Sequence, residues 1–195
     1  MRARWLVVSL ALLAGSAVAA QEKVEGNRYS NPTYGIQITK PPSWHFITAG
    51  TILDLAKKAA GGQKIRGDED PVKLAGFAVI VSKVPVLGRS IDPNVVLRVH
   101  EAAAPPDDTV KACELLRTGM TEPETVRPTR RLQLEGRPAA RLDFQGLVDG
   151  AMVRATALCT FRERRAFVVV GQALSSEFDG ELSRFESILQ SFTLK

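Results

Sequence analysis

Four segments that alternate apolar and polar residues follow one another in the second half of the chain. They cover residues 130–134, 139–145, 151–161 and 166–174, and turns at Glu135-Gly136, Asp149-Gly150 and Glu163-Arg164 separate them. An Asp-Gly dipeptide between two alternating segments is a strong signal for a β-hairpin. Successive hairpins pair neighbouring strands in opposite directions, so this half of the chain predicts an antiparallel meander.

Helical spacing of apolar residues appears in three other segments. One begins near Thr51 and stops at Gly61-Gly62, and a second follows Asp107-Asp108 and ends near Gly119. The third follows Ser176 and has one apolar stripe, formed by Phe178, Leu182, Phe185, Ile188, Leu189 and Phe192. Further strands are predicted at 34–39, 74–84 and 94–101, with a loop at 61–73. Helices that fall between or after antiparallel strands predict an α+β fold instead of a βαβ repeat.

The first twenty residues have the form of a secretory signal. Arg2 and Arg4 precede a short apolar stretch, and small residues up to Ala20 suit a signal peptidase. We therefore expect residues 1–20 to be removed, 21–30 to be a flexible lead-in, and 31–195 to form a single domain. No cysteine lies near the cleavage point, so we expect a soluble protein, without a lipid anchor, in a bacterial periplasm or outside the cell.

Cys113 and Cys159 are the two cysteines of the chain. Export to an oxidising compartment favours a disulfide between them. The alternative is that both are buried thiols that pack as small apolar side chains. The sequence has no Cys-x-x-Cys motif, so neither redox catalysis nor a cysteine zinc site is predicted.

Two stretches carry a resemblance to a known family. Residues 29–44 (YSNPTYGIQITKPPSW) resemble the opening strand and Pro-x-x-Trp turn of PsbP-like proteins, and residues 185–192 (FESILQSF) are similar to their closing helix. The resemblance spans nearly the whole mature chain. It implies an α/β/α sandwich in which helices cover a twisted, mainly antiparallel sheet, with Trp44 as a packing residue. These relatives, among them the extrinsic oxygen-evolving-complex subunit and a Ran-binding nuclear-import factor, share a docking fold without common catalytic residues.

Motifs of catalysis are absent from the sequence. His45 and His100 are 55 residues apart, and neither has a carboxylate or a second ligand at a suitable spacing. No Gly-x-Ser-x-Gly elbow, His-Glu-x-x-His motif, phosphate-binding loop or dinucleotide fingerprint is present. We therefore expect a non-catalytic binding or accessory module that needs no cofactor. A hydrolase whose triad is hidden by sequence order is the alternative.

Acidic residues cluster at 68–70 and at Asp107-Asp108. Three consecutive acidic side chains in a loop point in different directions, so 68–70 does not by itself provide the oxygen cage that a hard cation needs. Asp107-Asp108 is better explained as a helix N-cap. A metal-dependent accessory subunit remains a third hypothesis.

Residues 127–165 contain nine arginines and four acidic residues. Strand alternation predicts that Arg131, Arg141 and Arg154 lie opposite Leu132, Leu142 and Val153, and therefore on one polar face of the meander. Such a face attracts anions in a salt-dependent way. We expect weak contact with an anionic surface or an envelope protein, and no nucleic-acid partner. The alternative is an ordinary solvated surface.

Overall fold

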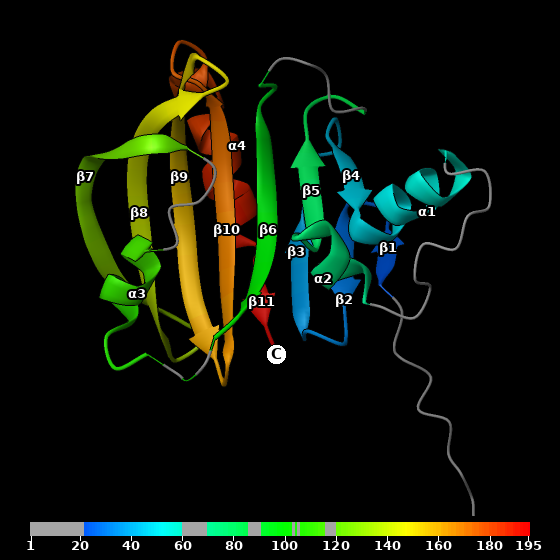
Figure 1. Ribbon diagram of the computed structural model, residues 1–195, viewed down its shortest axis with the longest axis horizontal. Coiled ribbons are helices and arrows are strands. Elements are labelled where there is room, and N and C mark those ends of the chain that lie inside the picture. The colour runs from blue at the N-terminus through cyan, green and yellow to red at the C-terminus, as the bar shows by residue number, and fades with distance from the viewer. Residues whose placement is uncertain (1–21, 60–69, 86–90, 103, 105, 116–119) are drawn as a thin grey trace, which may run out of the picture.

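The computed structural model describes residues 22–59, 70–85, 91–102, 104, 106–115 and 120–195. Within these residues the chain forms two antiparallel sheets and four helices (Figure 1). The larger sheet has seven strands in the order β4-β5-β6-β10-β9-β8-β7, and the smaller has four in the order β1-β2-β3-β11. The predicted α+β class is therefore confirmed.

The predicted meander is one side of the larger sheet. It consists of β7 (Thr121–Leu134), β8 (Arg137–Val148), β9 (Ala151–Arg162) and β10 (Arg165–Leu174), each paired antiparallel with the next. The first two hairpin turns place Gly136 and Gly150 at φ 79° and 81°, a conformation that glycine adopts without steric strain. The first strand begins nine residues earlier than predicted, and its pairing with β8 is interrupted by three register shifts.

The other side of the larger sheet consists of β6 (Asn94–Glu101), β5 (Val79–Ser82) and β4 (His45–Thr48). The prediction of a continuous strand over 74–84 is wrong, because the short helix α2 (Pro71–Ala75) occupies its start. Asp70 caps α2 through the N–H of Val72, and Gly76 ends it in the left-handed conformation. Only the segment from Val79 onward is therefore free to extend.

The smaller sheet contains residues that the sequence suggested were a loose lead-in. β1 (Lys23–Glu25) and β2 (Arg28–Asn31) pair with each other, β3 (Ile36–Thr39) pairs with β2, and β11 (Thr193–Leu194) completes the sheet. The expectation of a flexible segment at 21–30 therefore differs from the structure over 22–30. Tyr29 explains the difference, since it is fully buried against the core.

The main core lies between the two sheets and helix α4 (Phe178–Gln190). α4 lies behind the larger sheet in Figure 1 and contacts β10, β9, β6 and β3. Trp44 is 2% exposed, and its ring meets Phe185 of α4 edge-on at 6.1 Å between centroids. The packing role implied for Trp44 is thus observed.

The opposite face of the larger sheet is covered by α3 (Thr109–Leu115) and α1 (Ala49–Ala59). α3 packs on β8, β7 and β9 over a second cluster of buried residues that includes Leu142, Phe144 and Val168. Ile52 of α1 packs on a third cluster of Ile47, Ile80 and Val96. Both faces of the meander are therefore apolar, and this double coverage decides where its arginines can lie.

Candidate functional site

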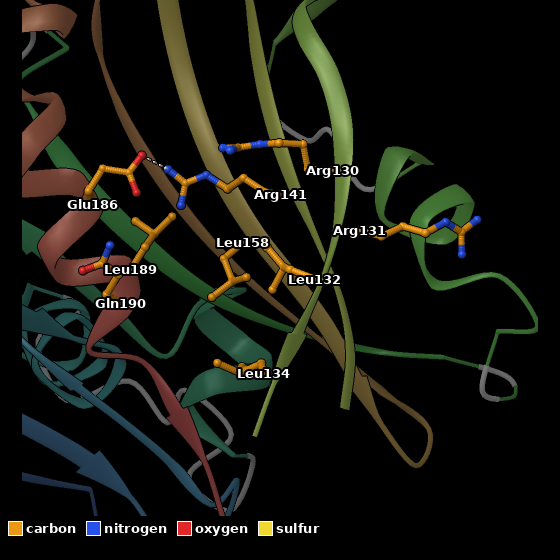
Figure 2. Close-up of a pocket in the computed structure, with 9 residues that line it drawn as sticks. All are labelled: Arg130, Arg131, Leu132, Leu134, Arg141, Leu158, Glu186, Leu189 and Gln190. Carbon is orange, nitrogen blue, oxygen red and sulfur yellow. Dashed lines mark hydrogen bonds and ion pairs between the residues drawn. The ribbon is translucent and has the colours of Figure 1, made fainter. Parts of the chain in front are cut away.

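A groove of about 420 Å³ lies between the edge strand β7 and helix α4. Figure 2 shows β7, β8 and β9 on one side and α4 on the other. Four leucines form its apolar lining: Leu132, Leu134, Leu158 and Leu189. Its volume falls within the range of about 300–1,000 Å³ that is usual for ligand pockets.

Arg141 of β8 is the buried charge of this groove. Its side chain is 8% exposed, and Nη2 donates to Oε1 of Glu186 on α4 at 2.5 Å. Burial lowers the pKa of Arg141, and the nearby charge of Arg130 acts in the same direction, against the Glu186 and Asp143 carboxylates. Because the usual pKa of arginine is above about 12, the guanidinium stays charged. Its Nε atom has no hydrogen-bond partner in the structure.

Arg130 lies directly opposite Arg141 across the β7–β8 ladder. Both side chains extend toward α4 in Figure 2. Arg141 forms an ion pair with Glu186, whereas Arg130 forms none with any described carboxylate. Like charges directly opposite each other on neighbouring strands repel. The groove therefore presents more positive charge than Glu186 neutralises, next to an apolar wall.

The predicted single face of Arg131, Arg141 and Arg154 is wrong. Arg131 points toward α3 on the other side of the sheet, where Nη2 pairs with Asp108 at 3.1 Å (Figure 2). Arg154 shares the α4 side with Arg141, but its guanidinium lies 4.7 Å from the centre of the Phe178 ring and pairs with Asp179 at 3.1 Å. Arg131 borders the groove, but of the three side chains only that of Arg141 extends into it, together with that of Arg130.

The three arginines do not share one face and one groove because helices cover both sides of the sheet. The prediction assumed that Leu132, Leu142 and Val153 all face one core. Leu132 instead packs against the α4 core, whereas Leu142 lies in the α3 cluster and Val153 is fully buried. Arg130 was not predicted for the same reason. Its spacing of two and four residues from Leu132 and Leu134 puts all three on one face of the strand, and this is the signal that could have placed Arg130 in the groove.

Cys113 and Cys159 are brought together beneath α3. Their sulfur atoms are 2.07 Å apart, and their Cα atoms are 5.8 Å apart. Both residues are buried within the cluster that contains Leu142, Ala157 and Val168. The small residues Ala155 and Ala157 on the same side of β9 let α3 approach the strand closely. The pair is therefore at the distance that a disulfide needs.

The two histidines do not converge. His45 is exposed on β4 in register with Ser82 and, through β5, with Asn94 of β6, whereas His100 lies six residues further along β6. That separation corresponds to roughly 20 Å along a strand. Burial, and then the neighbouring charge of Arg98, lower the pKa of His100. Neither histidine lines the groove.

The acidic clusters are used in local structure where they are described. Asp108 accepts hydrogen bonds from the N–H groups of Val110 and Lys111, as predicted for an N-cap of α3. Asp70 caps α2 and also accepts a hydrogen bond from the Tyr34 hydroxyl, while residues 68 and 69 lie outside the described part of the chain. In that part no three His, Cys, Asp or Glu residues form a group suited to a metal ion.

The residues that the structure describes include no helix that is both long enough and apolar enough to cross a bilayer. The predicted signal segment at 1–20 and most of the predicted loop at 61–73 lie outside those residues.

No protein-family model and no curated protein matches the sequence. Two solved structures are similar across nearly their whole length. One is cyanobacterial PsbP (CyanoP) from Synechocystis sp. PCC 6803, with a TM-score of 0.51 and 15% identity over 93% of this chain and 96% of that chain. The other is LpqN of Mycobacterium tuberculosis, described as involved in cell envelope biogenesis, with a TM-score of 0.52 and 13% identity over 90% and 91% of the two chains. The antiparallel sheet, the closing helix α4 and these two similarities together show that the chain has a PsbP-like fold.

Proposed function

We propose that this chain is an exported accessory protein that binds a protein partner in the cell envelope without transforming it. The lining of the groove between β7 and α4 carries the proposal. It is made of leucines, arginines, Gln190 and Glu186, and the one carboxylate is already bonded to Arg141. A lining of this kind suits recognition of an anionic group beside an apolar one. It offers no serine, cysteine or histidine to act as a nucleophile or base.

Three observations support the proposed location. Residues 1–20 have the pattern of a secretory signal. Cys113 and Cys159 lie at disulfide distance, which favours an oxidising compartment. LpqN, which shares the fold, is described as involved in cell envelope biogenesis. We therefore place the mature protein, beginning at Ala20 or Gln21, in the periplasm or outside the cell.

The experiment that tests the function is crosslinking in the native envelope, followed by affinity capture and reconstitution. We expect one captured envelope protein to form a complex of fixed stoichiometry with the purified mature chain. N-terminal sequencing of the same native material tests the location, and an intact Met1 would contradict it. Turnover of an ester or peptide substrate that is lost on changing His45→Ala or His100→Ala would overturn the non-catalytic assignment in favour of a hydrolase.

A further inference from the structure

β7 is the terminal strand of the larger sheet. It pairs with β8 on one side, and among the described strands none pairs with it on the other. Figure 1 shows β7 at the left end of the sheet, with α3 in front of the lower part of β7 and β8. Along this side the backbone groups of a terminal strand can pair with another extended segment.

The two halves of β7 differ in how they resist such pairing. Residues 121–129 contain Pro123 and Pro128 and the three register shifts against β8. Prolines and bulges are devices that block edge-to-edge pairing. From Arg130 to Leu134 the pairing with β8 is regular, and this segment of β7 contains no proline. Only this second half is therefore suited to accept another strand.

The regular half of β7 is also the half that lines the groove. Arg130, Leu132 and Leu134 share the α4 side and line it together with Arg141 and Leu158. A strand added at this edge would direct alternate side chains into the same groove. The side chain next to Arg130 would meet positive charge, and those next to Leu132 and Leu134 would meet an apolar wall.

From this geometry we propose that residues 130–134 of β7 bind an extended segment of the partner as an additional antiparallel strand, with an acidic side chain beside Arg130 and apolar side chains beside Leu132 and Leu134. The inference rests on the proposed binding function and assigns it a ligand chemistry. An antiparallel segment in this register has the pattern apolar-x-apolar-x-acidic. Main-chain hydrogen bonds supply affinity in such complexes, and the alternate side chains supply specificity.

A peptide fits these features better than other occupants do. A lipid tail cannot satisfy the free backbone N–H and C=O groups along residues 130–134, whereas an extended peptide can. A second copy of β7 would bring Arg130 and Arg131 of both chains into one interface, and the paired segments 130–134 would supply no carboxylate. The unmatched charge of Arg130 selects an acidic partner segment.

The test uses the mature full-length protein and a fluorescent peptide of sequence STLTLTES. A first control peptide carries lysine in place of the glutamate, and a second carries proline in place of the threonine between the leucines. We expect the lysine and the proline peptides each to bind at least tenfold more weakly. Arg130→Glu should weaken binding of the glutamate peptide at least tenfold and strengthen binding of the lysine peptide. Amide NMR shifts should be confined to β7, β8 and α4.

Arg131→Gln is the matched control, because Arg131 is also exposed but directs its side chain to the α3 side of the same strand. It should change the affinity less than threefold, whereas Arg130→Gln should weaken binding about tenfold. Equal losses for the two variants would overturn the proposal in favour of non-specific attraction. If the proline peptide binds as tightly as the glutamate peptide, the proposed strand pairing is overturned.

The groove would be assigned to lipid if anionic phospholipid vesicles bind in an Arg130-dependent way and the peptide does not bind. An envelope partner that is captured unchanged by Arg130→Glu would contradict this site and leave the proposed function intact.

Discussion

Phe185 of α4 packs directly onto Gly171 of β10. A Cβ atom at position 171 would lie 2.8 Å from Cγ and 2.9 Å from Cβ of Phe185. The Phe185 ring is fully buried and is held between Trp44, with centroids 6.1 Å apart, and Phe178, with centroids 5.5 Å apart. The close approach of α4 to the sheet therefore depends on the missing side chain at 171.

Gly171→Ala should destabilise the protein. The added methyl group has to displace a fully buried ring that already contacts Trp44 and Phe178. Overpacking of this kind typically costs about 1–3 kcal/mol. We expect the urea midpoint of the variant to fall with an unchanged slope.

Gly180→Ala is the control for that variant. Gly180 lies in the first turns of α4, and a Cβ there would meet nothing within 4 Å. Alanine is favoured over glycine in a helix by about 0.5–1 kcal/mol, so this variant should be more stable than the native protein. Equal losses for the two variants would contradict the role assigned to the Gly171–Phe185 contact.

The cysteine pair gives a prediction about redox state. We expect thiol titration of the unfolded, unreduced protein to find no free thiol. The two residues are 46 positions apart in sequence, and closing a loop of that length stabilises by about 4 kcal/mol in the chain-entropy model. Reductant should therefore lower the unfolding temperature of the native protein and leave that of a Cys113→Ala, Cys159→Ala double variant unchanged. Two free thiols would refute the bond.

The parts of the fold that could be predicted are those in which local signals agree with tertiary packing. The strands at 139–145, 151–161 and 166–174 alternate and are joined by two-residue turns, and the stripe of α4 has one clear period. β1 and β2 are only three and four residues long, so their place depends on Tyr29 reaching the core and not on a pattern. A short strand has too few residues to show a period.

The candidate site was less predictable, because alternation defines two faces of a strand without saying which face meets which core. In a sheet buried on both sides, Leu132 and Leu142 are equally apolar and face opposite helices. A groove also depends on a partner from a distant element, and nothing near Arg141 in sequence indicates Glu186 of α4.

The ion pair in the groove should matter more to stability than the one on the α3 side. Changing Glu186→Leu leaves the buried guanidinium of Arg141 without its carboxylate, and an unsatisfied group of this kind costs about 1–3 kcal/mol. Arg131→Gln breaks the pair with Asp108, in which Arg131 is 72% exposed, and should change stability by less than about 1 kcal/mol. Denaturant unfolding of both variants checks this order, and a larger loss for Arg131→Gln would contradict it.

Glu181 predicts a pH dependence of stability. It lies in the first turn of α4 with its side chain 9% exposed, and it accepts hydrogen bonds from Lys83 at 2.7 Å and Arg184 at 2.9 Å. Burial acts to raise the pKa of Glu181, but the hydrogen bonds and charges of Lys83 and Arg184 outweigh it, so the pKa in the folded protein is lowered. A carboxylate of this kind stabilises the fold above its unfolded pKa of about 4.3 and stops doing so as the pH falls through the folded value.

Glu181→Gln should therefore be less stable than the native protein at pH 7, by about 1–3 kcal/mol, because the amide offers Lys83 and Arg184 no charge. The difference should narrow as the pH falls below about 4.3, because the unfolded chain then binds a proton that the folded carboxylate still resists. It should stop changing below the folded pKa, where the native side chain is neutral like the glutamine. The measurement is the free energy of unfolding of both proteins between pH 7 and about pH 3. Glu163→Gln, at an exposed turn, should match the native protein throughout. If the difference in free energy of unfolding between Glu181→Gln and the native protein stays constant across this range, the lost stability comes from packing and not from the charge of the carboxylate.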